Sequence, residues 1–130
     1  MVRFILFITM IALTSCNDGK LKKYESIVRE ADRFEIYYKS TDKTVAVPEQ
    51  MTSNFKDILT RNINPETQRN FINDVKIGIY KENKEIGFLM IADGGKSPFV
   101  NFNSDKVNFG FRLTYGIGQT IDNLYADNSR

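Results

Sequence analysis

Apolar residues recur at steps of three or four in three parts of the chain, the spacing that gives a helix one hydrophobic face. The first part runs from Lys20 to Ala31, and the second follows Pro48, a residue suited to the first position of a helix. Asn64-Pro65 ends the second helix, and Pro65 could open a further helical turn toward Phe71. The third helix follows Thr114, a candidate N-cap. The predicted buried residues of the three helices are Leu21, Tyr24, Ile27, Val28, Ala31, Met51, Phe55, Ile58, Leu59, Ile63, Ile117, Ile121, Leu124 and Tyr125.

Six further segments have the composition of β-strands. The segment from Val107 to Leu113 is the clearest, because every second side chain is apolar and Asn108, Gly110 and Arg112 lie between them. Such alternation is typical of an antiparallel sheet with one face packed on helices and the other facing water or a ligand. The predicted strands are residues 34–39, 44–47, 74–81, 85–92, 99–103 and 107–113, with turns at 40–43, 82–84, 93–96 and 104–105.

The order of elements is therefore helix, two strands, helix, four strands, helix. This order predicts an α+β fold, in which a mainly antiparallel sheet, made of two strands plus a four-strand meander, packs about three helices on one face. A chain of 130 residues has room for one hydrophobic core. We expect residues 20–130 to form this single α+β domain.

The N-terminus has a different pattern. Arg3 gives the start of the chain a positive charge, and the segment from Phe4 to Leu13 is apolar except for Thr9. This run is too short for a membrane-spanning helix, which needs about 20 residues, but it has the length of the hydrophobic region of a signal peptide. The alternative is a buried strand or helix, with Cys16 as an ordinary core cysteine. The run has no amphipathic period, which favours the signal peptide.

Leu13-Thr14-Ser15-Cys16 follows this run and resembles the lipobox of bacterial lipoproteins: an aliphatic residue, two small residues and then the cysteine. The resemblance implies that the thiol of Cys16 receives a diacylglycerol group and that a peptidase cleaves the chain before this residue. Residues 1–15 would then be the signal peptide, and residues 16–19 the lipidated cysteine with a short tether. In enteric lipoproteins an aspartate after the cysteine favours the inner membrane, so Asn17 favours the outer membrane if the bacterium has one.

The resemblance places the domain in the bacterial cell envelope, lipid-anchored to a membrane and facing the periplasm or the cell surface. Lys20, Lys22 and Lys23 follow the anchor and could contact anionic head groups or lie on a solvated helix face. The formal net charge is +2, from 18 Lys and Arg against 16 Asp and Glu. This excess is too small to indicate nucleic acid as a partner, since nucleic-acid binding needs a concentrated basic surface.

The residue types that support most catalysis are missing. The chain has no histidine, and its one cysteine is Cys16. With that cysteine acylated, neither a Ser-His nor a Cys-His nucleophile can be assembled, and the ligands that zinc prefers are absent. We therefore expect no enzyme activity, no metal and no cofactor. A glycosidase with two catalytic carboxylates is the remaining enzymatic alternative. Gly116-Ile117-Gly118 lacks the third glycine and the strand context of a phosphate-binding loop.

Six polar or aromatic side chains fall on the outward side of the predicted strands. Tyrosine and arginine are frequent interface anchors, and asparagine supplies adaptable hydrogen bonds. On adjacent strands they would form one binding patch; the alternative is a solvated sheet surface. Gly78, Gly87 and Gly110, inside predicted strands, indicate β-bulges or places where another backbone or a ligand comes near, and bulges are the favoured interpretation. The candidate binding residues are Tyr37, Tyr80, Asn101, Asn103, Asn108 and Arg112.

Export, anchoring and the missing catalytic residues together favour a membrane-tethered, non-catalytic module that binds an envelope protein or polymer. A second hypothesis is an inhibitor or immunity lipoprotein that neutralises a toxin or a lytic enzyme. The carboxylate-based glycosidase is the third.

Overall fold

The computed structural model describes residues 19–92, 98–112 and 115–128. The predicted lipidation site Cys16, the predicted turn at 93–96, Leu113 and the candidate N-cap Thr114 lie outside these residues. The elements are the N-terminal helix (residues 19–30), β1 (Arg33–Tyr38), β2 (Lys43–Ala46), the 3-10 helix η1 (Glu49–Met51), α2 (Thr52–Thr60), β3 (Asn73–Lys81), β4 (Lys84–Ala92), β5 (Phe99–Asn103), β6 (Asn108–Arg112) and α3 (Tyr115–Asn128).

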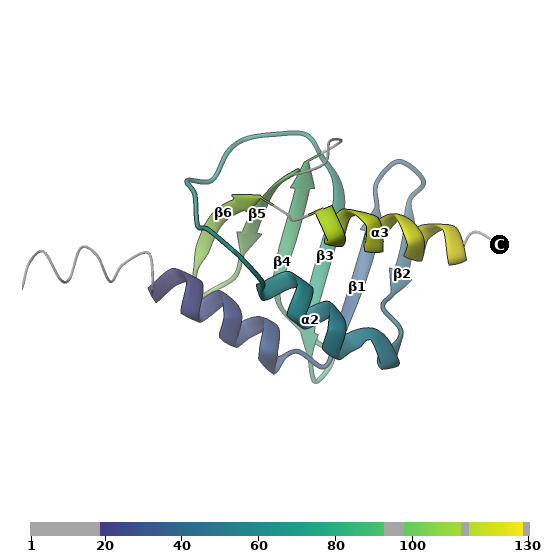
Figure 1. Cartoon of the computed structure of the whole chain (residues 1–130), viewed down its shortest axis with the longest axis horizontal. Coiled ribbons are helices and arrows are strands. Elements are labelled where there is room, and N and C mark those ends of the chain that lie inside the picture. The colour runs from purple at the N-terminus through teal and green to yellow at the C-terminus, as the bar shows by residue number, and fades with distance from the viewer. Residues whose placement is uncertain (1–18, 93–97, 113–114, 129–130) are drawn as a thin grey trace, which may run out of the picture.

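The six strands form one antiparallel sheet in the order β2-β1-β3-β4-β5-β6 (Figure 1), which confirms the α+β class. The four later strands are neighbours in chain order. The two early strands join them because β1 pairs with β3 along its whole length, from Arg33 opposite Tyr80 to Tyr38 opposite Val75. The predicted hairpin and meander are therefore parts of a single sheet.

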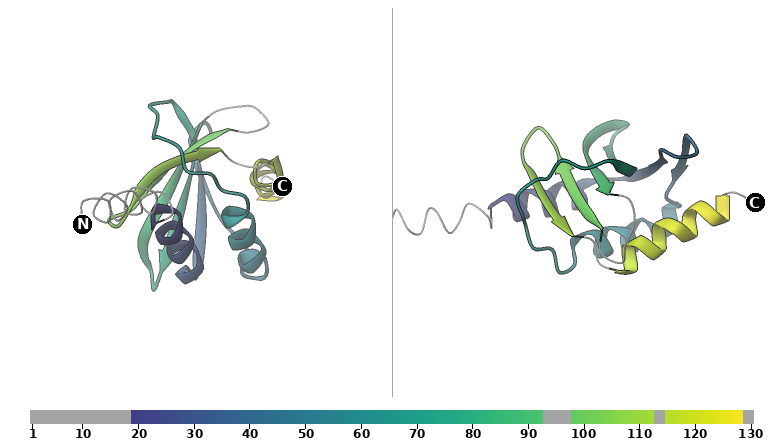
Figure 2. Two further views of the ribbon diagram at one scale, coloured as in Figure 1. Left: turned by 60° about the vertical axis from the view of Figure 1, so that its left-hand side comes forward. Right: turned by 90° about the horizontal axis from the view of Figure 1, so that it is seen from above.

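The helices lie in front of the sheet in Figure 1, and the view from above in Figure 2 shows α3 running along one side of it. Alternate side chains of the strands point to this side and form one core with the helices. Tyr24 of the N-terminal helix lies at its centre: the ring is 4.7 Å from that of Phe102, and the hydroxyl donates a 2.7 Å hydrogen bond to the carbonyl of Leu59. Tyr38 similarly donates to the carbonyl of Ile121, which holds α3 against β1.

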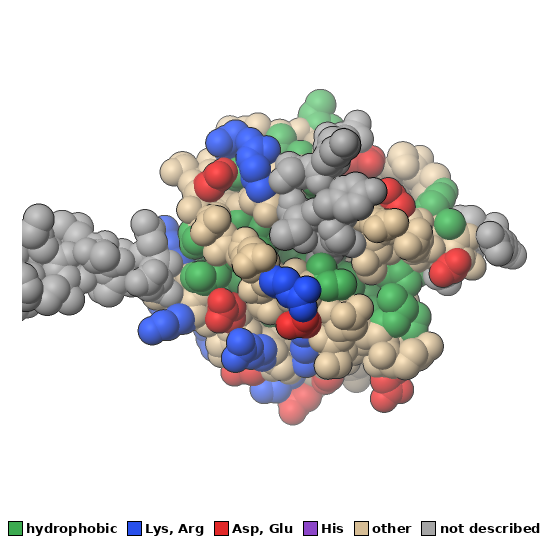
Figure 3. Space-filling model, viewed as in Figure 1, with side chains coloured by type: hydrophobic (Ala, Val, Ile, Leu, Met, Phe, Trp, Pro, Cys, Tyr) green, Lys and Arg blue, Asp and Glu red, His purple; other side chains and the backbone are tan. Residues whose placement is uncertain are grey.

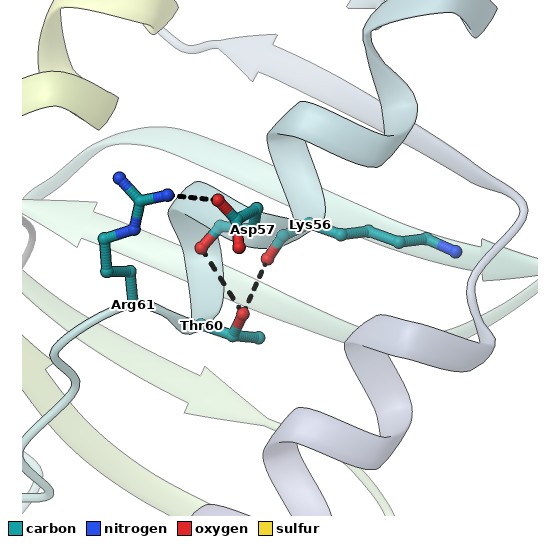
Figure 4. Close-up of polar contacts among 4 residues, drawn as sticks. All are labelled: Lys56, Asp57, Thr60 and Arg61. Carbon is teal, nitrogen blue, oxygen red and sulfur yellow. Dashed lines mark hydrogen bonds and ion pairs between the residues drawn. The ribbon is translucent and has the colours of Figure 1, made fainter.

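The second predicted helix begins later and ends earlier than its apolar pattern. Pro48 precedes η1 as its cap, with ψ 143°, rather than occupying the first helical position. At the other end, Thr60 donates its hydroxyl hydrogen to the carbonyls of Lys56 and Asp57, and Arg61 pairs with the Asp57 carboxylate (Figure 4). Such side-chain bonds compete with the helical ladder, and Arg61 is already extended.

The helical turn predicted after Pro65 is wrong. Residues 61–72, which we call the crossing segment, leave α2 and run past β6 before reaching β3 (Figure 1). Glu66 forms an antiparallel bridge with Gly110 of β6. The distance from the Glu66 nitrogen to the Gly110 oxygen is 2.6 Å, and the distance from the Gly110 nitrogen to the Glu66 oxygen is 3.0 Å. Pairing with the exposed edge of β6 gives hydrogen-bond partners to the N–H and C=O of Glu66, which a helical turn would otherwise have bonded within the segment.

Candidate binding face

The sheet has an outer face, on the side away from the helices, and this face has two halves. Over β5 and β6 the crossing segment lies on it, since Asn101 exchanges hydrogen bonds with the backbone of Arg69. Over β1, β3 and β4 the outward side chains are partly exposed, and we call this half the open face. Its residues are Arg33, Glu35, Tyr37, Lys76, Tyr80, Glu85, Phe88 and Met90.

Charged side chains on the open face alternate in sign and stack on aromatic rings. The Arg33 guanidinium lies 4.6 Å from the centre of the Tyr80 ring and 3.4 Å from the Glu35 carboxylate. Lys76 repeats this arrangement, with its ammonium 4.6 Å from the centre of the Phe88 ring and 3.6 Å from Glu85. Ion pairs this exposed contribute at most about 1 kcal/mol each to stability. Their main consequence is that the side chains are already ordered.

Tyr80 crosses the sheet over Gly78. A Cβ atom at position 78 would lie 2.8 Å from Cε2 of Tyr80 and 3.2 Å from a carboxylate oxygen of Glu85. Gly78 pairs regularly with Glu35 and Phe88, so the bulge interpretation is wrong here, and the space above the glycine is filled by the side chains of Tyr80 and Glu85. Burial, together with the charges of Glu85 and Glu35 and hydrogen bonds to both, raises the pKa of the Tyr80 hydroxyl. The Tyr80 hydroxyl therefore lies near the carboxylates of Glu85 and Glu35.

A hollow of about 310 Å³ adjoins this cluster at the end of the sheet formed by the β5–β6 turn. Phe88, Asn103 and Asn108 lie in one row across β4, β5 and β6 and line the hollow, with Glu85 beside them. The side-chain oxygens of Asn103 and Asn108 accept hydrogen bonds from Gln68 and from the Ser104 N–H. The side-chain NH₂ groups of both asparagines have no partner among the described residues, so they can donate to a ligand.

All six sequence-predicted binding residues lie on the outer face, but they do not form one patch. Tyr37 sits at the far end of β1, where its hydroxyl donates to Asp42 in the β1–β2 turn at 2.7 Å. Asn101 holds the crossing segment, and Arg112 lies 5.8 Å from the centre of the Phe99 ring. The structure brings Asn103 and Asn108 to the hollow beside Glu85. The Glu85 carboxylate in turn forms a 3.6 Å ion pair with Lys76.

The covered half of the outer face is built around Phe99. Its ring is 6% exposed, packs edge-on against Phe71 and lies under the guanidinium of Arg69. Gly110 makes room for it: a Cβ atom there would lie 2.4 Å from Cζ of Phe99 and 3.1 Å from the carbonyl oxygen of Thr67. Gly110 is in regular register with Asn101, so the bulge interpretation is wrong here too. Gly87, by contrast, flanks a register irregularity in the β3–β4 pair.

Six residues of the open face, Met90 among them, were not among the predicted binding residues. Arg33, Glu35, Lys76, Glu85 and Phe88 join Tyr80 in one cluster. Alternation along β1 already indicates that Glu35 and Tyr37 point outward together. Glu85 follows Lys84 in the sequence, but its ion-pair partner is Lys76 on the neighbouring strand. Only the β3–β4 register reveals that pairing.

The carboxylates of the open face are paired with cations. Both carboxylates near Tyr80 face a cation, Glu35 with Arg33 and Glu85 with Lys76.

Within residues 19–92, 98–112 and 115–128, no three His, Cys, Asp or Glu side chains are grouped so as to hold a metal ion. None of the helices in this same part of the chain is long and apolar enough to cross a membrane. No protein-family model, curated protein or solved structure matches the chain.

Proposed function

We propose that this protein is a lipoprotein of the bacterial cell envelope, anchored through Cys16, whose domain is a non-catalytic binding module. The open face and the adjoining hollow would bind another envelope protein or an envelope polymer. The observation that carries the proposal is the ordered cluster around Tyr80, which combines two aromatic rings, two cations and two carboxylates on a solvent-accessible surface.

The physical support is preorganisation. Binding costs the entropy of every side chain that becomes ordered, roughly 0.5–1.5 kcal/mol for a flexible one. Arg33 and Lys76 are long side chains, yet their stacking and ion pairs already hold them in place. Tyrosine and arginine are also the residue types enriched among interface hot spots. Side chains that are already stacked and ion-paired lose less conformational entropy on binding than freely solvated ones, which favours a recognition role.

The anchor and the binding face need separate tests. Intact mass of the protein extracted from bacterial membranes should show a diacylated or triacylated chain that begins at Cys16, and Cys16→Ala should lose the acyl groups. An unmodified chain that retains Met1 would refute the anchor. The binding face is tested in cells that make the protein, by placing a photo-crosslinking amino acid at Met90 on the open face or at Asn54, an exposed position on α2.

We expect a discrete adduct from position 90, none from position 54, and at least a tenfold weaker adduct at position 90 after Tyr80→Ala. Truncating a buried hot-spot side chain costs about 2 kcal/mol or more, which is the basis of this factor. Equal crosslinking from both positions, or an adduct unaffected by Tyr80→Ala, would refute the assignment. The mass of the adduct distinguishes a polymer, a structural envelope protein and a lytic enzyme or toxin.

A further inference from the structure

The described chain begins close to the predicted anchor, at a surface made by two distant segments. Gly19 follows Cys16 by three residues, which span at most about 11 Å when fully extended. Gly19 and Lys20 line a hollow of about 570 Å³ together with the β5–β6 turn, residues 104–108. This turn, more than eighty residues away in the sequence, therefore lies within reach of the membrane surface once Cys16 is acylated.

Three lysines meet at this hollow: Lys20 and Lys23 from the N-terminal helix, and Lys106 from the turn. All three are exposed, and none forms an ion pair with another described residue. Asp105 is the acidic residue in the lining. Figure 3 shows basic side chains flanking the start of the described chain. A surface with unpaired cations and one carboxylate attracts anionic groups.

Lys22, the remaining lysine at the start of the N-terminal helix, lies elsewhere. It lines a different hollow with Glu25, Arg29 and Glu30 on the solvent side of the N-terminal helix. Sequence position therefore does not decide which lysines can act together. The fold selects Lys20 and Lys23 and adds Lys106.

We propose that Lys20, Lys23 and Lys106 bind the anionic phospholipid head groups of the membrane that holds the acyl chains. This inference rests on the lipid anchor of the proposed function. Each lysine near an anionic bilayer surface increases the population of the bound orientation by about fivefold. The contact fixes the orientation of the domain: the β5–β6 turn faces the bilayer, and β2 and the end of α3 point away from it (Figure 1).

The test uses the acylated protein, purified from bacterial membranes and reconstituted into lipid nanodiscs that contain a gadolinium-labelled lipid. One set of discs is made of zwitterionic phosphatidylcholine. The other contains about 30% phosphatidylglycerol, which gives it an anionic surface. Paramagnetic broadening of backbone amide signals reports which residues lie near the head groups. In anionic discs we expect residues 104–107 to broaden at least about threefold more than residues 39–42, and 0.5 M salt (roughly a 4 Å Debye length) to abolish this difference.

Two lysines in turns give a matched comparison. Lys106→Glu should reduce the broadening at residues 104–107 about fivefold or more, while Lys39→Glu, at the opposite end of the sheet, should leave it unchanged. Asp105→Asn should increase it. Equal broadening in the two lipid compositions, or equal effects of Lys106→Glu and Lys39→Glu, would overturn the head-group contact. Failure of the anchor is distinguishable, because an unacylated chain is detected by its mass before reconstitution.

Discussion

Gly110 is the position at which one methyl group should have the largest effect. An alanine there places its Cβ 2.4 Å from Cζ of Phe99 and 3.1 Å from the carbonyl oxygen of Thr67. Carbon atoms pack at about 3.5–4.0 Å, so the Phe99 ring must move by more than about 1 Å. The ring is 6% exposed and sits beneath Phe71 and Arg69, and its displacement therefore disturbs the whole crossing segment.

The cost of Gly110→Ala can be estimated from these contacts. Overpacking a closed site costs about 1–3 kcal/mol. Loss of the edge-on contact between Phe71 and Phe99, 5.9 Å between ring centres, adds about 1 kcal/mol, and loss of the Arg69 contact adds about 0.5 kcal/mol. We expect a free energy of unfolding lower by about 3 kcal/mol, and a melting temperature lower by roughly 12 °C for a domain of this size.

Urea unfolding followed by circular dichroism measures this change, and Gly118→Ala is the matched control. Gly118 lies in α3, and a Cβ there meets nothing within 4 Å. That alanine should stabilise the protein by up to about 1 kcal/mol through helix propensity.

The steric cause has its own test. In a Phe99→Leu background, where the shorter side chain leaves room for the methyl group, Gly110→Ala should cost less than about 1 kcal/mol. A Gly110→Ala protein with the urea midpoint of the wild type would refute the reasoning, as would the same cost in both backgrounds.

Three further changes are expected to alter stability, each measured by urea unfolding. Tyr24→Phe removes the donor to the buried Leu59 carbonyl and should cost about 1–3 kcal/mol, whereas Tyr37→Phe, which loses an exposed bond, should stay within about 0.5 kcal/mol; equal costs would contradict this. Burial raises the pKa of Tyr38 to about 12 and that of Tyr24 further above its ordinary value of 10.0. Because both pKa values are higher in the folded state, the contribution of the protonated tyrosines to the free energy of unfolding is complete below pH 10 and falls as the pH rises, by up to about 1.4 kcal/mol per pH unit for each group. Tyr38→Phe should flatten the decrease of the free energy of unfolding between pH 10 and 12, and an unchanged decrease would contradict the assignment. Glu82→Gly should stabilise by about 1 kcal/mol, because Glu82 has a φ of 52° in the β3–β4 turn, while Lys81→Gly within β3 should destabilise.

The local elements could be predicted because their signals are contained in short stretches of sequence. The apolar stripe of the N-terminal helix, the alternation in β6 and the turn at Glu82-Asn83 all depend on residues a few positions apart, and the structure bears them out. The turn after Pro65 was predicted wrongly for the complementary reason. Its conformation depends on the bridge to Gly110, some forty residues away.

The candidate site shows the same division. Outward direction follows from the two-residue period of a strand, so all six predicted residues lie on the outer face. Which of them can act together depends on strand order and register, which a period cannot encode. Asn101 and Arg112 serve the covered half because the crossing segment lies there, and Glu85 joins Tyr80 because β3 and β4 pair in one particular register.

From the amino-acid sequence by itself, three properties of this protein follow: one α+β core, which face of each strand is buried, and the absence of histidine-based chemistry. The resemblance to a lipobox adds the prediction of an anchor at Cys16. The tertiary structure alone decided that the outer face has an open half and a covered half, and that Lys106 lies beside Lys20 and Lys23. The physical reason is range: periodicity and composition act between near neighbours in the chain, whereas these surfaces are made by contacts between segments that only folding brings together.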